Sequence, residues 1–312
     1  MIATVTLNPS LDEWMDLPSL QVGTLNRASG FARYPGGKGL NVSRVVRELG
    51  ERTLAFGLAG GEDGMILRSL MNRLALPHDF LSVLGSTRNN YKIRTRRPRA
   101  VTEVNMQGPV ISRAILSALQ QRLLQHRPIP QVFVLSGSLP PGVPVTIYRR
   151  WIAAFRRLKV PAVLDASGEA FREGVLANPW LIKPNRQEAE ELLGSRLTRM
   201  KRLVDAARRL LKFGPSLAIL SMGKDGALMA SRRSHAVWLA RPPSVKTDSA
   251  VGAGDSLVGG FLVGWIRRLS LVEAFRLGVA CGTATAVTPG TELCHRRDIE
   301  RFLPRVVIRQ VG

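Results

Sequence analysis

A run of small residues that ends in an acid stands directly before the apolar stretch 257–266: Asp248-Ser249-Ala250-Val251-Gly252-Ala253-Gly254-Asp255-Ser256. Small residues let several backbone N–H groups turn toward one point, and at the start of a helix these donors and the helix dipole favour a bound phosphate. Asp255 then has two interpretations. It caps the helix, or it accepts the proton of a hydroxyl group that attacks the γ-phosphate of a nucleotide. The run therefore predicts an anion hole at Gly252, Ala253 and Gly254 with a candidate catalytic base beside it.

Two further loops follow short apolar runs. In Lys183-Pro184-Asn185-Arg186-Gln187-Glu188, the first turn of the expected helix contains both Asn185 and Glu188. Their oxygens suit Mg²⁺, which is usually bound through water, but the same spacing is that of a capping box, which needs no metal. The loop Ser221-Met222-Gly223-Lys224-Asp225-Gly226 can wrap its backbone around a nucleotide or form a tight turn. The residues alone leave these alternatives open.

Near the amino terminus, the run Gly36-Gly37-Lys38-Gly39 precedes a helical stretch that contains Asn41. Such a run lets the backbone approach a polyhydroxy ligand closely. Asp12 can accept hydrogen bonds from sugar hydroxyl groups, and Arg88 can form a forked, charge-assisted pair with a phosphate. Taken singly, each is more simply explained as a solvated loop residue. The sequence lacks the G-x-x-x-x-G-K-[ST] run and the H-R-D and D-F-G motifs, which argues against a P-loop kinase and a protein kinase.

The elements that must position these residues alternate along the chain. From about residue 130, the apolar runs 132–135, 162–164, 181–182 and 217–220 each end at a polar residue, namely Ser136, Asp165, Lys183 and Ser221. Between them, apolar residues recur at spacings of three and four over 112–126, 145–158, 187–193 and 199–213. We therefore predict an α/β fold with a parallel sheet, whose loops bring ligand groups together at the carboxyl edge of the strands. Residues 3–7 are predicted as another strand and 40–49 as a helix.

Two segments, 11–34 and 88–104, have weaker helical periodicity. We predict that they form short strands that pair into a small β lid over the carboxyl edge of the sheet. The sequence has no internal repeat and no low-complexity linker. We therefore expect a single domain over residues 1–312, with the lid as part of it.

The charge of the chain is strongly positive, because 45 Lys and Arg residues face 23 Asp and Glu residues, for a net charge of +22. Such a charge attracts polyanions weakly, but most of the basic residues are scattered over predicted helix faces, so we expect no specific nucleic-acid partner. The densest basic cluster, 88–99, can steer an anionic substrate.

No stretch approaches the roughly 18 unbroken apolar residues of a membrane span, and the first residues lack the features of a signal peptide. We expect a soluble cytoplasmic protein without a membrane partner.

Taken together and in this order, the motifs resemble the ribokinase-like sugar kinase superfamily, in its phosphofructokinase B branch. The run 248–256 resembles the GAGD signature of this family, and residues 36–41 resemble its amino-terminal glycine signature. The segments Ser136-Gly137-Ser138-Leu139-Pro140-Pro141-Gly142 and Lys183-Pro184-Asn185, with the N-x-x-E metal motif, match the branch closely. The resemblance covers nearly the whole chain. It implies a three-layer α/β/α fold with a central, mostly parallel sheet and a small β lid, and ATP with Mg²⁺ as the phosphate donor.

The resemblance also implies roles for individual residues, carried over by position. Asp255 would be the base, with Gly252, Ala253 and Gly254 as the anion hole. Asn185 and Glu188 would organise the metal. The nucleotide site would take Ser221, Gly223, Gly226, Lys183 and Asn185, and the acceptor site would take Asp12, Gly37, Lys38, Asn41, Arg88 and Ser138.

The acceptor implied for this branch is a ketohexose phosphate: fructose 6-phosphate, fructose 1-phosphate or tagatose 6-phosphate. Residues 290–294 and 165–171 resemble the minor 6-phosphofructokinases of glycolysis, whereas Lys38 and residues 24–27 resemble 1-phosphofructokinases and tagatose 6-phosphate kinases. The alternatives are a kinase for an unphosphorylated sugar or a nucleoside, and a protein that uses this fold to bind a polyanion. Arg88 would have no role without a phosphate on the acceptor, which favours the phosphosugar. Since the lid often supports dimerisation in this superfamily, we expect a homodimer through the lid.

Overall fold

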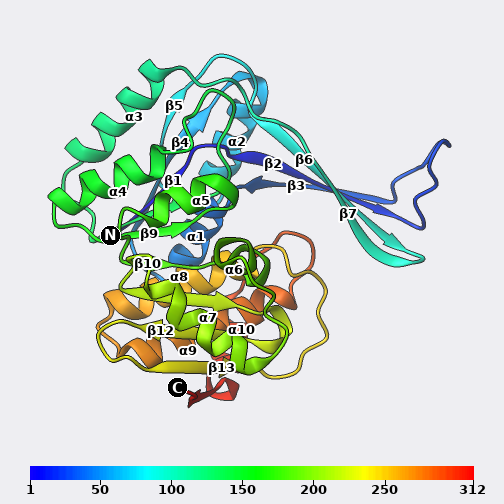
Figure 1. Cartoon of the computed structure of the whole chain (residues 1–312). Helices are drawn as coiled ribbons and strands as arrows, with labels where there is room; N and C mark the ends of the chain where they lie inside the picture. Colours follow the sequence, from blue (N-terminus) through cyan, green and yellow to red (C-terminus); the bar gives the residue numbers. More distant parts are fainter.

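The computed structural model describes all residues from 1 to 312, and it has one large and one small sheet (Figure 1). The large sheet has ten strands in the order β14-β13-β12-β11-β10-β9-β8-β1-β4-β5. From β5 to β11 all neighbouring strands are parallel, and the three strands beyond β11 pair antiparallel. The bounds are β1 (Ile2–Thr6), β4 (Thr53–Ala59), β5 (His78–Ser82), β8 (Val132–Ser136), β9 (Ala162–Asp165), β10 (Leu181–Ile182), β11 (Leu217–Ser221), β12 (Ala227–Ser231), β13 (Val237–Arg241) and β14 (Val307–Gln310).

Helices cover both faces of this sheet, because its central strands are apolar on both sides. In β8, Phe133 and Leu135 enter one core cluster, whereas Val132 and Val134 enter the other, as the alternation of side chains along a strand requires. The first cluster includes residues of α3 (Arg113–Gln125), α4 (Ile147–Arg157), α5 (Gly168–Val175), α6 (Arg186–Leu193) and α7 (Met200–Leu211). The second includes residues of α1 (Lys38–Glu48), α8 (Ala253–Ile266), α9 (Leu271–Ala286) and α10 (Arg296–Phe302). The predicted three-layer α/β class is confirmed.

A smaller cluster lies at the β5 edge, where α2 (Gly61–Arg73) packs its buried residues against β4 and β5. Two short 3₁₀ turns, Gly223–Asp225 and Leu303–Arg305, complete the helical elements. None of the helices combines the length and the apolar character that crossing a bilayer requires.

The small sheet has four strands in the order β3-β2-β6-β7 and projects from the body of the molecule (Figure 1). Its strands are β2 (Ser10–Leu17), β3 (Gly30–Gly36), β6 (Arg88–Arg96) and β7 (Arg99–Asn105), so the segments 11–34 and 88–104 do contain strands that pair with one another. The register places Asp12, Asn90 and Asn105 side by side, and all three face the body of the protein, where they line a large cavity. The inner face of this sheet is therefore polar.

Candidate active site

A cavity of about 1110 Å³ lies where the carboxyl ends of the large sheet meet the inner face of the small sheet. Thr6 at the end of β1, Gly137 after β8, Lys183 after β10 and Ser221 at the end of β11 all line it, as expected for the loops of a parallel sheet. Of the residues predicted for the site, the cavity is lined by Asp12, Gly37, Lys38, Asn41, Arg88, Ser138, Lys183, Asn185, Ser221, Gly223, Gly226, Gly252, Ala253, Gly254 and Asp255. Glu188 alone does not line it. The fold thus brings residues separated by more than 200 positions to one cavity.

Asp255 occupies the first turn of α8 and is only 7% exposed. Its carboxylate does not cap its own helix: Asn41 of α1 donates its side-chain N–H to Asp255 Oδ2 at 2.8 Å. Asn41 therefore orients one carboxylate oxygen, while the residue as a whole borders the cavity. These contacts argue against the helix-cap interpretation of Asp255.

The turn before Asp255 has the geometry of an anion hole. Gly252, the residue before α8, has φ +79°, a left-handed conformation that a side chain would strain. A Cβ atom on Gly254 would lie 3.2 Å from Lys183 Nζ, so only glycine leaves the lysine and the backbone open to the same ligand. The first N–H groups of a helix have no partners within the helix. Together with Lys183 they present donors and positive charge to the cavity.

Two lysines and a buried acid surround this turn. Asp165, at the end of β9, is fully buried, and Lys38 Nζ and Lys183 Nζ lie 2.9 Å and 3.3 Å from its two carboxylate oxygens. Burial by itself raises the pKa of Asp165, but the charges of Lys183 and Lys38 outweigh it, so the pKa lies below its ordinary value. The sequence indicated Asp165 as the polar end of an apolar run and as the start of a segment that carries the family resemblance, but not as a site residue. Asp165 pairs with both lysines only in the folded protein, so a local sequence pattern could not predict this role.

The pKa of Asp255 is raised to about 6, first because the carboxyl is buried and second because the negative charge of Asp165 is near. Lys38, Lys183 and the hydrogen bond from Asn41 act in the opposite direction. Above pH 6 the group is therefore mostly a carboxylate, and it is a stronger base than an exposed aspartate. A base of this strength suits removal of a proton from a hydroxyl group near neutral pH.

Asn185 and Glu188 form a capping box at the start of α6. The Glu188 N–H donates to Asn185 Oδ1 and the Asn185 N–H donates to Glu188 Oε2, both at 2.8 Å. The other carboxylate oxygen of Glu188, Oε1, is 3.8 Å from Lys38 Nζ. No group of three or more His, Cys, Asp or Glu side chains in the chain could hold a metal ion directly. The capping interpretation is thus correct, and it leaves one Glu188 oxygen uncommitted to the helix.

The small sheet supplies a second polar group to the cavity. Asp12 Oδ2 lies 2.5 Å from Lys92 Nζ, and Asp12 Oδ1 accepts hydrogen bonds from Ser10 and Asn90. Lys92 is only 4% exposed and was missed as an individual site residue, because the sequence shows it only as one of six basic residues between 88 and 99. Arg88 lines the cavity and donates to the backbone carbonyls of Asn8 and Met106.

Comparison with known proteins identifies the family. The model of the pfkB family of carbohydrate kinases matches residues 5–297. The chain belongs to this family. The 1-phosphofructokinase of Bacillus subtilis is 38% identical over 311 residues, which covers 100% of both chains. The ATP-dependent 6-phosphofructokinase isozyme 2 of Mycobacterium tuberculosis is 34% identical over 303 residues, 96% of this chain and 88% of that one. The crystal structure of phosphofructokinase-2 from Escherichia coli in complex with fructose-6-phosphate is 30% identical, with a TM-score of 0.90 over 97% of this chain and 98% of that one.

The pfkB family match confirms the resemblance that the motifs carried and makes the chain an ATP-dependent carbohydrate kinase. It gives the cavity at the carboxyl edge a reaction type, the transfer of a phosphoryl group to a sugar. In such a reaction catalysis rests mainly on positioning and on stabilisation of charge. The elements that fix the small sheet relative to the glycine turn before α8 are therefore of interest in this kinase.

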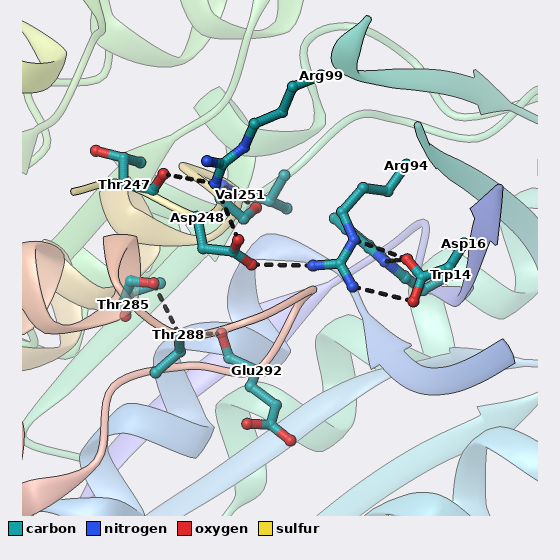
Figure 2. A network of polar contacts seen from close by, with 11 residues as sticks. Trp14, Asp16, Arg94, Arg99, Thr247, Asp248, Val251, Thr285, Thr288 and Glu292 are labelled. Carbon is teal, nitrogen blue, oxygen red and sulfur yellow. Dashed lines mark hydrogen bonds and ion pairs between the residues drawn. The ribbon is translucent and has the colours of Figure 1, made fainter. Parts of the chain in front are cut away.

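One network in this kinase joins the small sheet to the run that precedes α8 (Figure 2). Arg94 of β6 donates from Nε and Nη2 to the carboxylate of Asp16 at 2.7 and 3.0 Å, and from Nη1 to Asp248 Oδ2 at 3.1 Å. Its guanidinium also lies over the Trp14 ring, 5.6 Å from the centroid. Arg99 donates to Asp248 Oδ1 and to the Thr247 carbonyl. The network therefore connects β2 and β6 with the residue four positions before Gly252.

Replacing Arg94 with glutamine is expected to raise KM for the sugar substrate about tenfold, because one charge-assisted connection between the small sheet and the loop is lost. Arg99→Gln is the matched control: Arg99 contacts the same carboxylate but is 59% exposed, so its loss should change KM less than about twofold. Steady-state kinetics of both variants make the comparison. Equal effects of the two substitutions would contradict the special role of Arg94.

Proposed function

We propose that the protein transfers the γ-phosphoryl group of ATP to fructose 1-phosphate, giving fructose 1,6-bisphosphate and ADP. The observation that carries the chemistry is the buried carboxylate of Asp255, hydrogen-bonded to Asn41 and next to the glycine turn at the start of α8. The acceptor hydroxyl oxygen forms the new bond to the γ-phosphorus, the bond from that phosphorus to the β–γ bridging oxygen breaks, and Asp255 takes the hydroxyl proton. ADP leaves with the electron pair of the broken bond.

The choice of acceptor rests on similarity and on charge. Among the relatives, the B. subtilis 1-phosphofructokinase is 38% identical over the full length of both chains. Lys38, Lys92 and Arg88 all line the cavity, and three cations suit a phosphorylated sugar better than a neutral sugar or a nucleoside. Asp12, fixed by Lys92, is placed to accept hydrogen bonds from sugar hydroxyl groups. We assign Asp12, Gly37, Lys38, Asn41, Arg88 and Ser138 to the acceptor.

ATP is assigned to the part of the cavity that the 3₁₀ turn after β11 lines. Ser221, Gly223 and Gly226 border it, as do Val245 and Val279, whose apolar side chains suit a nucleotide base. Lys183 and the N–H groups of the first turn of α8 lie where the phosphates would reach the anion hole. This arrangement points the γ-phosphate toward Asp255.

Mg²⁺ would accompany the ATP phosphates and neutralise part of their charge. Because Asn185 and Glu188 bond to each other as a capping box, the protein offers no complete set of direct ligands. Glu188 Oε1 and the cavity-facing Asn185 fit a magnesium ion that keeps most of its waters and is bound mainly by phosphate oxygens. The pair is therefore proposed to orient the hydrated ion rather than to chelate it.

A coupled assay of ADP release tests the substrate. With ATP and Mg²⁺, kcat/KM is expected to be at least about tenfold higher for fructose 1-phosphate than for fructose 6-phosphate or tagatose 6-phosphate, a preference that a difference of about 1.4 kcal/mol in transition-state binding gives. Fructose, ribose and adenosine should be poor acceptors. A preference for fructose 6-phosphate would assign the chain to the 6-phosphofructokinases, and activity only on the three unphosphorylated acceptors would overturn the phosphosugar assignment.

We further propose that the outer face of the small sheet pairs two chains into a homodimer. The register places Met15 opposite Phe31 and Ile93, and Tyr91 opposite Val104, so these five side chains share the face that points away from the cavity. Phe31 is 59% exposed and Val104 is 47% exposed. An apolar stripe across four strands is a candidate interface between copies.

Light scattering during size-exclusion chromatography tests the pairing. The unmodified protein is expected to elute as a dimer, and Phe31→Glu combined with Val104→Glu is expected to give a monomer, since a carboxylate would enter the apolar interface at each edge strand of the small sheet. Leu84→Glu with Leu176→Glu is the control, because both side chains are exposed apolar residues outside the small sheet. A dimer that survives the first pair, or is lost with the second, would contradict this interface.

A further inference from the structure

A second cavity, of about 1100 Å³, lies on the other side of α1. It is lined by residues of α1, by Met1 just before β1, by Thr53 at the start of β4, by the end of α2 and by residues 292–295. No residue lines both this cavity and the one that contains Asp255. The two cavities are thus separate sites.

The charge of this second cavity is positive, because six arginines and three glutamates line it. Five of its lining residues, Arg44, Arg47, Arg52, Arg73 and Arg127, make no ion pair with any carboxylate. Each of the three glutamates has another partner: Glu51 pairs with Arg267 at 2.8 Å, and Glu48 accepts the backbone N–H of Arg296 at 2.7 Å. Glu292 lies 3.7 Å from His295, which lines the same cavity. A concave surface with several unpaired arginines attracts anions of high charge.

Arg44 is the most informative of the five, because it is the least exposed to solvent. Its guanidinium makes only two long hydrogen bonds, both of 3.4 Å, to Asn41 Oδ1 and to the Thr291 carbonyl. Burial lowers the pKa of this guanidinium. A poorly hydrated cation without a carboxylate partner is unfavourable unless an anion compensates it. Arg44 therefore forms no ion pair, and the negative charges of Asp12 and Glu292 only partly offset its burial.

Arg44 also stands between the two cavities. Its Nη1 atom contacts Asn41 Oδ1, and the amide nitrogen of the same Asn41 donates to Asp255 Oδ2 at 2.8 Å. An anion that draws the Arg44 guanidinium toward the second cavity would weaken its hold on Asn41. The hydrogen bond that orients the catalytic carboxylate would then be less well fixed.

We propose that the second cavity binds a small, multiply charged phosphate anion, and that the bound anion slows the kinase through Arg44 and Asn41. Phosphate matches the planar donor fork of arginine, and several charges are needed to engage arginines from α1, α2 and the segment before β4 together. A pocket of about 1100 Å³ is of a size that holds a small molecule. The site is an inhibitory anion site distinct from that of the substrates.

Inorganic pyrophosphate is a suitable probe, studied with the full chain at fixed free Mg²⁺. Isothermal titration is expected to find two molecules bound per chain, one in each cavity. At saturating ATP and fructose 1-phosphate, where competition in the active site is removed, pyrophosphate is expected to lower kcat at least threefold. The calorimetric result does not depend on the identity of the sugar substrate, so it can be judged even if the proposed acceptor is wrong.

The test variant is Arg52→Glu with Arg73→Glu, two exposed residues whose side chains make no hydrogen bond or ion pair. It is expected to bind one pyrophosphate per chain and to keep kcat unchanged on addition of pyrophosphate. Arg150→Glu with Arg157→Glu on α4 makes the same change in net charge away from the cavity and should behave as the unmodified protein. One pyrophosphate per chain in the unmodified protein, an unchanged kcat, or the same loss in both variants would each overturn the proposal.

Discussion

Replacing Asp255 with asparagine is expected to lower kcat by roughly 10²- to 10⁴-fold, the range that a general base contributes. Asparagine keeps the shape and can still contact Asn41, but it cannot take the proton of the attacking hydroxyl. Binding of ATP, measured by calorimetry, should change less than about threefold, because the glycine turn and Lys183 are untouched. In the unmodified enzyme kcat should rise with pH through the pKa of about 6 as the base ionises. A variant that turns over within about threefold of the unmodified enzyme would contradict the assignment.

The same substitution should stabilise the fold, which separates loss of chemistry from loss of structure. The pKa of Asp255 is raised in the folded protein, from 3.8 to about 6. The folded state therefore binds this proton more tightly than the unfolded chain, and stability from this group is lost as the pH rises through that interval. At pH 7.5 the buried carboxyl group is ionised, which destabilises the folded state. Asp255→Asn is therefore expected to raise the free energy of unfolding by up to about 3 kcal/mol. Urea unfolding measures it, and a less stable variant would contradict the burial argument.

Replacing Asp165 with asparagine is expected to have the opposite effect on stability, a loss of about 3–5 kcal/mol. The carboxylate is fully buried and pairs with Lys38 and Lys183, of which Lys183 is itself only 4% exposed. Removing the one negative charge leaves two neighbouring cations in a poorly hydrated place. Since the pKa of Asp165 is lowered, its contribution is present at neutral pH and is lost as the pH falls through the acidic range.

Asp205→Asn is the matched control for this prediction. Asp205 pairs with Arg208 at 3.9 Å on the surface of α7, and both side chains are about half exposed, so its loss should cost less than about 0.5 kcal/mol. Urea unfolding at pH 7.5 and again near pH 4.5 compares the two. If Asp165→Asn costs no more than Asp205→Asn at pH 7.5, the buried triad does not stabilise the fold as argued.

The sequence could predict the elements whose apolar spacing is regular. The stretches 112–126, 145–158, 187–193 and 199–213 correspond to α3, α4, α6 and α7, with ends that differ by a few residues. α9 was not predicted, because it is buried on most sides and built largely of small residues, so no single apolar stripe marks it. The antiparallel strands β12 to β14 were also not predicted. β14 pairs with β13 across about seventy residues of sequence, and such pairing leaves no local signal.

The candidate site was predictable where a motif and a strand end coincide, as at Lys183, Ser221 and the glycine turn before Asp255. The sequence could not decide between a cap and a metal motif at Asn185, because the spacing is common to both. Lys92 could not be singled out from the sequence, because five arginines lie within seven residues of it. Only the pairing of β6 with β2 shows that Lys92 faces Asp12 while its neighbours Tyr91 and Ile93 face away. The role of Asp165 could not be predicted, because it depends on ion pairs with two lysines, Lys38 and Lys183, that lie far away in the sequence.

Phosphorus NMR of a reaction mixture with ATP, Mg²⁺ and fructose 1-phosphate tests the central claim most directly. The account predicts that the γ-phosphate signal of ATP falls while signals of ADP and of a second phosphate ester on the sugar grow in equal amounts, and that both products form at least about 100-fold more slowly with Asp255→Asn. Inorganic phosphate in place of a sugar bisphosphate, or a sugar bisphosphate formed at the same rate by Asp255→Asn, would contradict it.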